Sequence, residues 1–347
     1  MILIIGAGLS GLLTAYRLQK EGIPYKILEA RSRIGGRIHT LTTANHTPVE
    51  MGATWFTDVH NHLRSLLNEL AISYFEQYSK GSAFYQSTAA FAQEIQLPNQ
   101  PSSYRISGGS SNLIETLYSK LNPNNVLLNQ TVKEIKATSD GVLVVTDQVY
   151  EGTHAVLAIP PKLWSKNIVF EPPLPQSLTN VALQTHTWME DSIKVAVTYA
   201  AAFWQQENQS GMLFSTTGPL TEFYDHCDHA RSTFALCGFC STTFKNLSYE
   251  ERKTKVIHQL KNAFGEKATQ FLDYNECIWS QEPNTFHLSD SLLFPHQNNG
   301  HPIFSKTYYN DTLFISSAEA SAAFPGYMDG AVFVGNAIAK KLILAHQ

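Results

Sequence analysis

The sequence predicts an α/β fold in which a Rossmann-type domain with a parallel sheet is joined to a second domain on a mostly antiparallel sheet with helices. Residues 1–5 are apolar throughout, which is typical of a buried strand of a parallel sheet. Gly6, Gly8 and Gly11 follow directly with the spacing G-x-G-x-x-G. In the second half, several short β-type segments follow one another with few helices between them, as expected for an antiparallel sheet.

The opening glycine loop predicts a binding site for a dinucleotide. Its first glycine permits a tight turn, its second lets the backbone approach a pyrophosphate, and its third lets a helix pack on the strand. Residues 12–20 continue as that helix, whose N-terminus favours anions. Residues 23–28 predict a second strand that ends at Glu29, 29 − 11 = 18 residues beyond the last glycine, where a carboxylate can accept hydrogen bonds from ribose hydroxyls. The glycine pattern alone does not distinguish NAD from FAD.

The remainder of the first half alternates between helices and short strands. Residues 58–70 predict a helix with leucines on one face, and residues 111–121 predict a second such helix. Residues 79–101 are rich in serine, glutamine and aromatic residues, and we expect them to be irregular and to form a lid or an edge of a second domain. Residues 126–159 indicate successive strands, the last of which is stopped by Pro160 and Pro161.

The second half predicts a sheet of its own and then a return to the first domain. Strands are expected at residues 192–199, 212–217, 221–224, 232–240 and 270–279, with a helix at 249–264. A last apolar strand at 313–315 and a helix at 331–344 should rejoin the N-terminal strand, because both strands need a shared sheet to bury their two faces. We therefore expect a discontinuous dinucleotide-binding domain at 1–56, 104–164 and 295–347, and a substrate domain at 57–103 and 165–294.

The composition excludes several classes of protein. The chain has 347 residues, of which 43% are hydrophobic and 16% charged, and this suits a globular protein of two domains. Its net charge of −4 provides no basic surface for nucleic acid. No run of 18 apolar residues predicts a membrane span, and the first residues lack the features of a signal peptide. We expect a cytoplasmic protein that binds neither nucleic acid nor membrane, and the sequence leaves its oligomeric state open.

The four cysteines do not indicate a disulfide scaffold. Two of them, Cys237 and Cys240, form a C-x-x-C, but the surrounding residues predict a strand rather than the helix start of a redox motif. Because His226, Cys227 and His229 lie near in sequence, zinc binding stays open as a lesser alternative to buried thiols.

The chain resembles the flavin-containing amine oxidase family, the group of monoamine and polyamine oxidases, over nearly its whole length. Several separated blocks occur in the order of the family, and the last of them is the most specific. These blocks are Gly6 to Gly11, Glu29 to Arg37, Glu50 to Trp55, Gly108-Gly109, Val132 to Ile135, Ala158 to Pro161, Lys194 with Phe203-Trp204, Leu247 to Gly265, Trp279 to Pro283, and Glu319 with Gly326 to Ala331.

This resemblance implies a cofactor, FAD, and a set of residues that hold it. Gly6, Gly8 and Gly11 match the pyrophosphate loop, Glu29 matches the ribose ligand, and Arg31, Gly35, Gly36 and Arg37 match positions near the phosphates. Gly52, Ala53 and Thr54 match backbone near the isoalloxazine, and Val132 matches the residue at the adenine. Glu319 matches the acidic position near the ribityl and pyrophosphate, and Met328 matches the position beside the pyrimidine edge of the flavin.

The resemblance also implies two catalytic residues. Lys194 matches the lysine that reaches flavin N5 through a water, and Tyr327 matches one wall of the aromatic cage that receives the amine. A lysine within an apolar strand is costly to bury unless it is paired, and burial lowers its pKa. Without the resemblance, strand alternation favours Lys194 on the solvent face, and Tyr327 alone is more typical of an ordinary packed aromatic residue.

Three departures from the family bear on the substrate. Ser317 stands where a glycine is usual, and the segment between Trp55 and Gly108 is short. After Trp279 there is neither a tethering cysteine nor a second cage tyrosine, so FAD should be non-covalent and Phe286 is the candidate replacement wall. We expect an amine-like substrate oxidised to an imine, with O₂ as acceptor. The alternatives are a flavin-binding protein without oxidase activity, or a flavoprotein that oxidises an amino acid or reduced nicotinamide.

Overall fold

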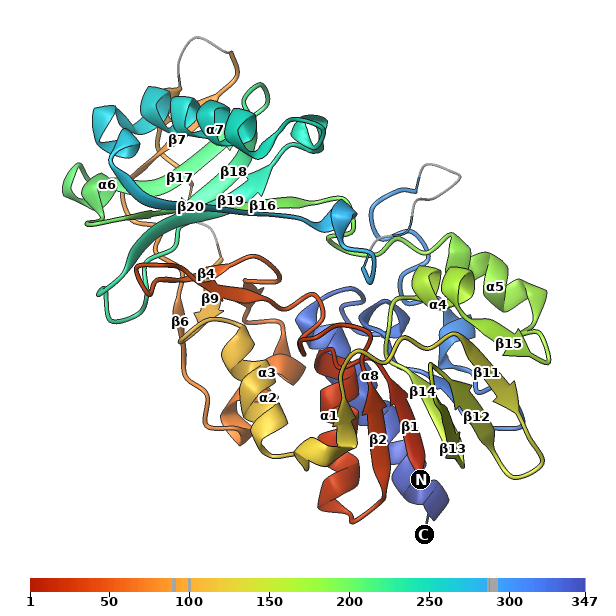
Figure 1. Ribbon diagram of the computed structural model, residues 1–347. Coiled ribbons are helices and arrows are strands. Elements are labelled where there is room, and N and C mark those ends of the chain that lie inside the picture. The colour runs from red at the N-terminus through yellow and green to blue at the C-terminus, as the bar shows by residue number, and fades with distance from the viewer. Residues whose placement is uncertain (89–91, 99–100, 286, 288–292, 347) are drawn as a thin grey trace.

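The protein consists of two bodies, each built around a sheet (Figure 1). The structure is a computed structural model that describes residues 1–88, 92–98, 101–285, 287 and 293–346. Figure 1 shows the N- and C-termini close together at the far end of the first body, whose sheet is flanked by α1 (Leu9–Lys20) and α8 (Met328–His346). No helix among the described residues is long and apolar enough to cross a membrane.

The first body contains a five-stranded parallel sheet in the order β10-β2-β1-β14-β21. These strands are β10 (Val126–Leu127), β2 (Tyr25–Leu28), β1 (Ile2–Ile5), β14 (His154–Leu157) and β21 (Leu313–Ile315). Ile2 and Ile4 face a core made with α1 and α8, whereas Leu3 and Ile5 face a second core on the opposite side. Both faces of β1 are thus buried, which explains its unbroken apolar sequence.

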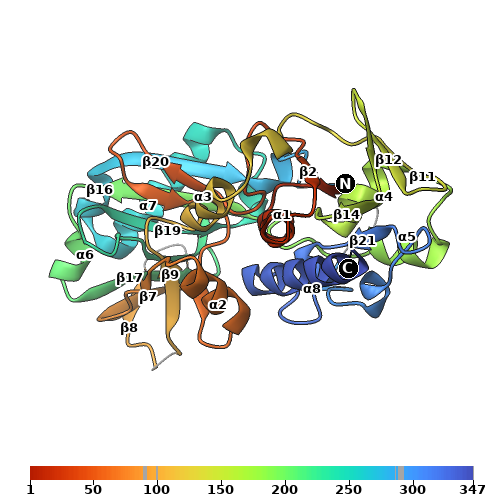
Figure 2. The same cartoon turned by 90° about the horizontal axis from the view of Figure 1, so that it is seen from below.

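The C-terminal segment returns to the N-terminal sheet, as predicted from its apolar strand. β21 pairs in parallel with β14, with Ala155 opposite Leu313 and Leu157 opposite Ile315. The helix that follows begins at Met328, three residues before the predicted start, and it lies beside α1 in both views (Figures 1 and 2). Gly335 permits this close packing, since a Cβ there would lie 2.9 Å from the Ser10 carbonyl oxygen.

A four-stranded sheet covers the other face of the parallel sheet. Its order is β13-β12-β11-β15, and its strands are β13 (Val149–Gly152), β12 (Val142–Val145), β11 (Glu134–Ala137) and β15 (Val169–Glu171). Its inner side packs Ile135, Val142 and Val144 against Leu3 and Ile5 of β1. The first body is therefore layered: helices, a parallel sheet and a smaller mixed sheet.

The second body is built on a seven-stranded sheet in the order β20-β16-β19-β18-β17-β7-β8. Its strands are β20 (Phe271–Ile278), β16 (Ile193–Tyr199), β19 (Phe234–Cys240), β18 (Leu220–Asp225), β17 (Gln209–Ser215), β7 (Ser82–Gln86) and β8 (Gln93–Ile95). All neighbours are antiparallel except β17 and β7. The expectation that residues 79–101 are irregular is wrong, because β7 and β8 extend this sheet.

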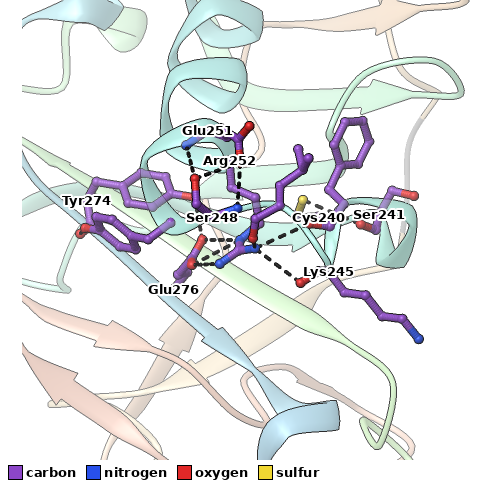
Figure 3. A network of polar contacts seen from close by, with 11 residues as sticks. Cys240, Ser241, Lys245, Ser248, Glu251, Arg252, Tyr274 and Glu276 are labelled. Atoms are coloured by element: carbon purple, nitrogen blue, oxygen red, sulfur yellow. Dashed lines mark hydrogen bonds and ion pairs between the residues drawn. The ribbon is translucent and has the colours of Figure 1, made fainter.

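Helix α7 (Tyr249–Phe264) covers one face of the large sheet, and the hairpin of β3 (Thr40–Thr42) and β4 (Pro48–Glu50) meets the other. Arg252 fastens α7 to the sheet, as Figure 3 shows, through two nitrogens bonded to the Glu276 carboxylate. The same guanidinium also donates to the backbone carbonyls of Phe244, Lys245 and Leu247. One buried side chain thus joins the helix, strand β20 and the segment that precedes the helix.

Helix α2 (Asn61–Glu69) packs with the first body, although residues 57–103 were expected in the substrate domain. Its leucines, Leu63, Leu66 and Leu67, belong to the same core as α1 and α8. Asp329 of α8 accepts a hydrogen bond of 2.8 Å from the Leu63 backbone N–H. This packing assigns α2 to the first body, and the full division into two domains stays a prediction.

The remaining elements connect these layers. They are β5 (Phe56–Thr57), β6 (Tyr74–Glu76) and β9 (Ser103–Ile106), which form a three-stranded sheet, the helices α3 (Ser111–Ser119), α4 (Pro161–Asn167), α5 (Gln176–Leu183) and α6 (Phe203–Gln206), and the short 3₁₀ helices η1 (Pro123–Asn125), η2 (Thr242–Phe244), η3 (Glu266–Thr269), η4 (Trp279–Gln281), η5 (Pro302–Ser305) and η6 (Ala318–Ala320).

Candidate functional site

A cavity of about 1180 Å³, including its open mouth, lies at the carboxyl edge of the parallel sheet. Segments from the N-terminal, middle and C-terminal parts of the chain line it. Eleven of the predicted site residues are among the lining residues: Gly6, Gly8, Glu29, Arg31, Gly35, Gly36, Arg37, Ala53, Val132, Tyr327 and Met328. The other five, Gly11, Gly52, Thr54, Lys194 and Glu319, are not among them. Each of these five contacts or neighbours a lining segment.

The glycine loop has open space where a phosphate would approach it. A Cβ added at Gly8 would have no atom within 4 Å, whereas one at Gly11 would lie 2.1 Å from the Gly6 carbonyl oxygen. Gly8 caps the N-terminus of α1 without a side-chain hydrogen bond, and the first turn carries no acidic residue. The free N–H groups of this turn are therefore available to an anion.

A second glycine turn lies against the first. The Gly35 N–H donates to the Ala7 carbonyl at 2.8 Å, and Gly8 and Gly35 form an isolated parallel bridge. Gly35 and Gly36 have φ of +98° and +59°, in the left-handed region that favours glycine. A Cβ at Gly36 would lie 3.5 Å from the Gly8 Cα. The two turns together form one backbone cradle.

Glu29 is buried at the end of β2 and is fixed by backbone donors. Its Oε2 accepts from the Ala7 N–H at 2.7 Å, and its Oε1 accepts from the Arg31 N–H at 2.9 Å. A carboxylate oxygen can accept more than one hydrogen bond, so this arrangement leaves lone pairs for a ribose hydroxyl. The Arg31 guanidinium donates to Thr285 Oγ1 at 2.6 Å and lies 3.5 Å from a Glu282 oxygen.

Arg37 and Glu319 join the N-terminal and C-terminal segments at the cavity. The Arg37 guanidinium makes a bidentate ion pair with the Glu319 carboxylate, at 2.5 Å and 3.1 Å, and it also donates to the Trp188 carbonyl at 3.1 Å. Glu319 is fully buried, whereas the Arg37 side chain is 19% exposed. The Arg37 guanidinium is thus accessible from the cavity, while the buried Glu319 carboxylate, which does not line the cavity, balances its charge.

Lys194 is buried between the two bodies, so the solvent-facing alternative is wrong. Its side chain is 1% exposed, and its Nζ donates to the Gly52 carbonyl at 3.2 Å and to Thr54 Oγ1 at 2.8 Å. Burial lowers its pKa, while Cys237, Glu50 and Glu222 act in the opposite direction. Ala53, between its two acceptors, lines the cavity. The ammonium group thus lies directly behind a lining loop.

Tyr327 belongs to an aromatic wall at the cavity. Its ring is stacked against His296 at 5.8 Å and Trp188 at 6.2 Å, and it lies 5.5 Å from His60. Trp188 also lines the cavity. Trp188 and His296 could not be predicted, because neither belongs to a block that resembles the family and they lie 296 − 188 = 108 residues apart in the sequence. Phe286, the predicted replacement wall, lies outside the described residues.

Ser317, where a glycine is usual, also lines the cavity. Its hydroxyl is buried and has no hydrogen-bond partner in the part of the chain that the structure describes, and the same holds for Ser316. Buried polar atoms are normally paired, so these hydroxyls suit a polar group placed beside them. The departure from the family therefore adds a polar group to the cavity.

The C-x-x-C lies on strand β19, as predicted. Cys237 faces the β4 hairpin and Cys240 faces α7, so the two thiols lie on opposite sides of the sheet. All four cysteines are free, and burial raises the pKa of Cys237 to about 11. Within the described ranges, no three histidine, cysteine or acidic side chains are grouped to hold a metal ion.

The cavity fits a dinucleotide. It combines an open backbone cradle at Gly8, a helix N-terminus, the cations Arg31 and Arg37, and the buried carboxylate of Glu29. These groups match the charges of a pyrophosphate and the hydroxyls of a ribose. The unpartnered Ser317 hydroxyl offers a further donor to a bound polar group.

Comparison with known proteins finds the family that the sequence blocks resemble. The family profile for flavin containing amine oxidoreductases matches residues 9–89 and 73–343. The chain is 21% identical to a probable flavin-containing monoamine oxidase A of Dictyostelium discoideum, over 98% of this chain and 97% of that protein. It is 23% identical to a putrescine oxidase of Kocuria rosea, over 81% and 82%. The first alignment runs over 452 positions, so that relative carries insertions.

Solved structures share the fold. Putrescine oxidase bound to putrescine superposes with a TM-score of 0.85 at 23% identity, over 99% of this chain and 98% of that one. Cyclohexylamine oxidase from Brevibacterium oxydans superposes with a TM-score of 0.87 at 18% identity, over 99% of both chains. At these identities the likeness establishes the α/β architecture.

Proposed function

The chain belongs to the family of flavin-containing amine oxidoreductases, and we propose that it is an oxidase that converts an amine to an imine and passes the electrons to O₂. As a member of this family it is an FAD-dependent oxidoreductase that acts on amines. The observation that carries the proposal is the cavity itself, where the dinucleotide cradle and the aromatic wall of Tyr327 and Trp188 line one continuous space.

We assign the cofactor contacts as follows. The cradle of Gly6, Gly8, Gly35 and Gly36 holds the pyrophosphate, with Arg31 and Arg37 as counter-charges and Gly11 as the packing contact behind it. Glu29 binds the ribose and Val132 contacts the adenine. Gly52, Ala53, Thr54 and Met328 would contact the isoalloxazine, with Ala53 and Met328 lining the cavity, and Glu319 holds Arg37. The described residues offer no cysteine among the lining residues, which supports non-covalent binding.

FAD, when bound, would supply the redox chemistry, which is the removal of a hydride from the carbon next to the amine nitrogen and the transfer of the electrons to O₂ to give H₂O₂. The chain contributes position and charge. Tyr327 and Trp188 present ring faces that orient an amine and exclude water from one side of the cavity. Lys194 places a cation behind the Gly52–Thr54 loop, where it favours negative charge that develops on oxygen.

The function is tested with purified protein and a substrate panel. The protein should be yellow, and acid should release its flavin into solution. An amine should then produce H₂O₂, measured by a peroxidase-coupled assay, whereas an amino acid and reduced nicotinamide should not. Flavin without peroxide from any amine would indicate a binding protein, and peroxide from the other two substrates would identify a different oxidase.

Lys194→Met tests the assigned role of the cation. The variant should keep FAD and still bleach with an active amine in the absence of oxygen. Its reoxidation by O₂ should slow by about a hundredfold, because one positioned stabilising group is lost. Stopped-flow measurement separates the two half-reactions, and an unchanged reoxidation rate would exclude Lys194 from the oxidative step.

A further inference from the structure

Lys194 is a buried cation that has no carboxylate partner. Within the described ranges it makes no ion pair, and its two hydrogen-bond acceptors are the neutral Gly52 carbonyl and Thr54 hydroxyl. An uncompensated ammonium group in a dry environment is costly and tends to lose its proton. To stay charged, Lys194 therefore needs favourable contacts in addition to the electrostatic influence of Cys237, Glu50 and Glu222, none of which is paired with it.

Two aromatic rings enclose the ammonium group. The Nζ of Lys194 lies 4.5 Å from the centroid of the Trp55 ring and 4.5 Å from that of Phe239. A cation over a ring face within about 6 Å is attracted by the ring quadrupole, most strongly when water is absent. Both distances are well inside that range, and the side chain is 1% exposed.

The two rings come from different bodies of the molecule. Phe239 is directly opposite Lys194 in the pairing of β19 with β16. Trp55 comes from the loop after β4, next to Thr54, and its indole N–H donates to Gln77 Oε1 at 2.8 Å. The Trp55 and Phe239 rings lie 6.3 Å apart, so the enclosure forms only where the cavity loop meets the large sheet.

We propose that Trp55 and Phe239 are positioning residues of the active site, which enclose the Lys194 ammonium group and keep it protonated behind the loop of Gly52 and Thr54. An ammonium group has three donors. Two of them are used by the loop and the rings cover two sides, so the orientation of the third is restricted. The inference rests on the proposed function only in that this charge acts on bound FAD.

Several other titratable groups face the same ammonium group, and the test variants leave them unchanged. Cys237 of β19, Glu50 of β4 and Glu222 of β18 favour its charged form. Burial, the Arg105 charge and the Lys194 charge, in that order, lower the pKa of the His226 imidazole. Burial raises the pKa of Glu50. None of these residues is changed in the variants below, so a shift reports the rings.

The charge state of Lys194 can be measured directly, without a substrate. In protein labelled with [ε-¹³C]lysine, the signal missing from Lys194→Met identifies Lys194, and its pH titration gives the pKa. Phe239→Leu should lower that pKa by about one unit, because one desolvated ring contact is lost. Phe239→Tyr should restore it.

Phe214→Leu is the matched control, since Phe214 lies on the same sheet and contacts Tyr224 but not Lys194. Its Lys194 titration should match that of the unchanged protein. If Phe239→Leu does not fold, Trp55→Leu removes the other ring and decides by the same measurement. An unchanged Lys194 pKa in the folded ring variants would overturn the proposal.

A second measurement separates this inference from the oxidase function. Protein carrying FAD is reduced by light and mixed with O₂ over a range of pH. The decline of the reoxidation rate at high pH should move to lower pH in Phe239→Leu by the same amount as the titration. If the Lys194 pKa shifts in Phe239→Leu but the pH dependence of reoxidation does not, the rings enclose Lys194 as proposed and Lys194 has no role in reoxidation.

Discussion

Gly8 and Gly11 show that one residue type meets two different physical demands within a single motif. At Gly8 the missing side chain leaves open space toward the cavity, and its φ of −75° suits any residue. At Gly11 the missing side chain permits contact with the Gly6 carbonyl oxygen. Gly8 therefore leaves room for a ligand, and Gly11 permits the packing of the fold.

This difference predicts opposite outcomes for two alanine substitutions. Gly8→Ala should fold with unchanged or slightly higher stability, but its affinity for FAD should fall by at least about tenfold because the new methyl group occupies the cradle. Gly11→Ala should lower the free energy of unfolding by about 1–3 kcal/mol through overpacking. Urea unfolding of the apoprotein measures the stability of each variant, and titration with FAD measures its affinity for the cofactor. Equal losses of stability in the two variants would contradict the separation.

The predicted site residues whose surroundings follow from the sequence are those that depend on local spacing. Glu29 needs only the strand and loop around it, and the structure fixes its carboxylate with the Ala7 and Arg31 N–H groups. The environment of Lys194 could not be predicted, because alternation allows either face of β16 and burial depends on the distant β4 hairpin. Trp188 joins Tyr327 only in the folded chain.

Helices α1 and α2 are joined by a charged contact at the edge of their apolar interface. Arg17 of α1 makes a bidentate pair with Glu69 of α2 at 2.5 Å and 2.6 Å, and Tyr16 and Lys20 lie at the same carboxylate. The hydrogen bond from Arg17 is the main cause that lowers the pKa of Glu69 to about 2.

The Arg17–Glu69 pair predicts a pH-dependent contribution to stability. The folded pKa of Glu69 is below its ordinary value of 4.5, so the contribution is fully present above about pH 5 and is lost as the pH falls toward 2. Since both side chains are partly exposed, it should stay below about 1 kcal/mol and shrink with salt. Urea unfolding of the protein and Glu69→Gln at pH 6 and pH 3 measures it. Glu266→Gln, which removes the exposed pair with Lys261, is the control. A loss of stability in Glu69→Gln that is larger at pH 3 than at pH 6 would contradict the assignment.

The Arg252–Glu276 contact of α7 should be worth more, because both side chains are nearly buried, at 5% and 7% exposed. Arg252→Met leaves the Glu276 carboxylate without its partner and should lower the free energy of unfolding by about 3–5 kcal/mol. Adding Glu276→Gln removes the isolated charge and keeps an acceptor for the Tyr274 hydroxyl, so the double variant should recover part of the loss. Additive losses in a double-mutant cycle by urea unfolding would show that the two residues act independently.

At the scale of elements, periodic segments were predicted and context-dependent ones were not. The leucine faces of α2 and the apolar strands of the first sheet follow from their sequences alone. β7 and β8 were missed because they are short and polar and become strands only by pairing with β17 and with each other. Tertiary pairing here outweighs weak local propensity.

At the scale of the whole molecule, the site exists only because three separated segments meet. Gly6 to Arg37 come from the N-terminus, Val132 from the middle, and Tyr327 and Met328 from the C-terminal return. The ion pair of Arg37 with Glu319 links the first and last of these segments across the cavity. The order of the family's blocks suggested this convergence, and the need of two apolar strands for a shared sheet suggested the C-terminal return. Local spacing could not, since Arg37 and Val132 are 132 − 37 = 95 residues apart and Val132 and Tyr327 are 327 − 132 = 195 residues apart.

Binding of FAD should therefore protect all three segments together. A ligand that binds only the folded state stabilises it by about 2.7 kcal/mol at a hundredfold excess over Kd. Hydrogen exchange of the apoprotein with and without FAD should slow jointly in the loop after β1, in residues 130–132 and at the start of α8. Helix α7, which lies on the far side of the large sheet, should change much less. The Gly8→Ala variant should show less of this protection at the same FAD concentration, at most about 1.4 kcal/mol, because its affinity is at least about tenfold lower. Protection limited to the N-terminal loop would mean that the C-terminal return does not contact the cofactor, and the assignments of Met328 and Tyr327 would then fail.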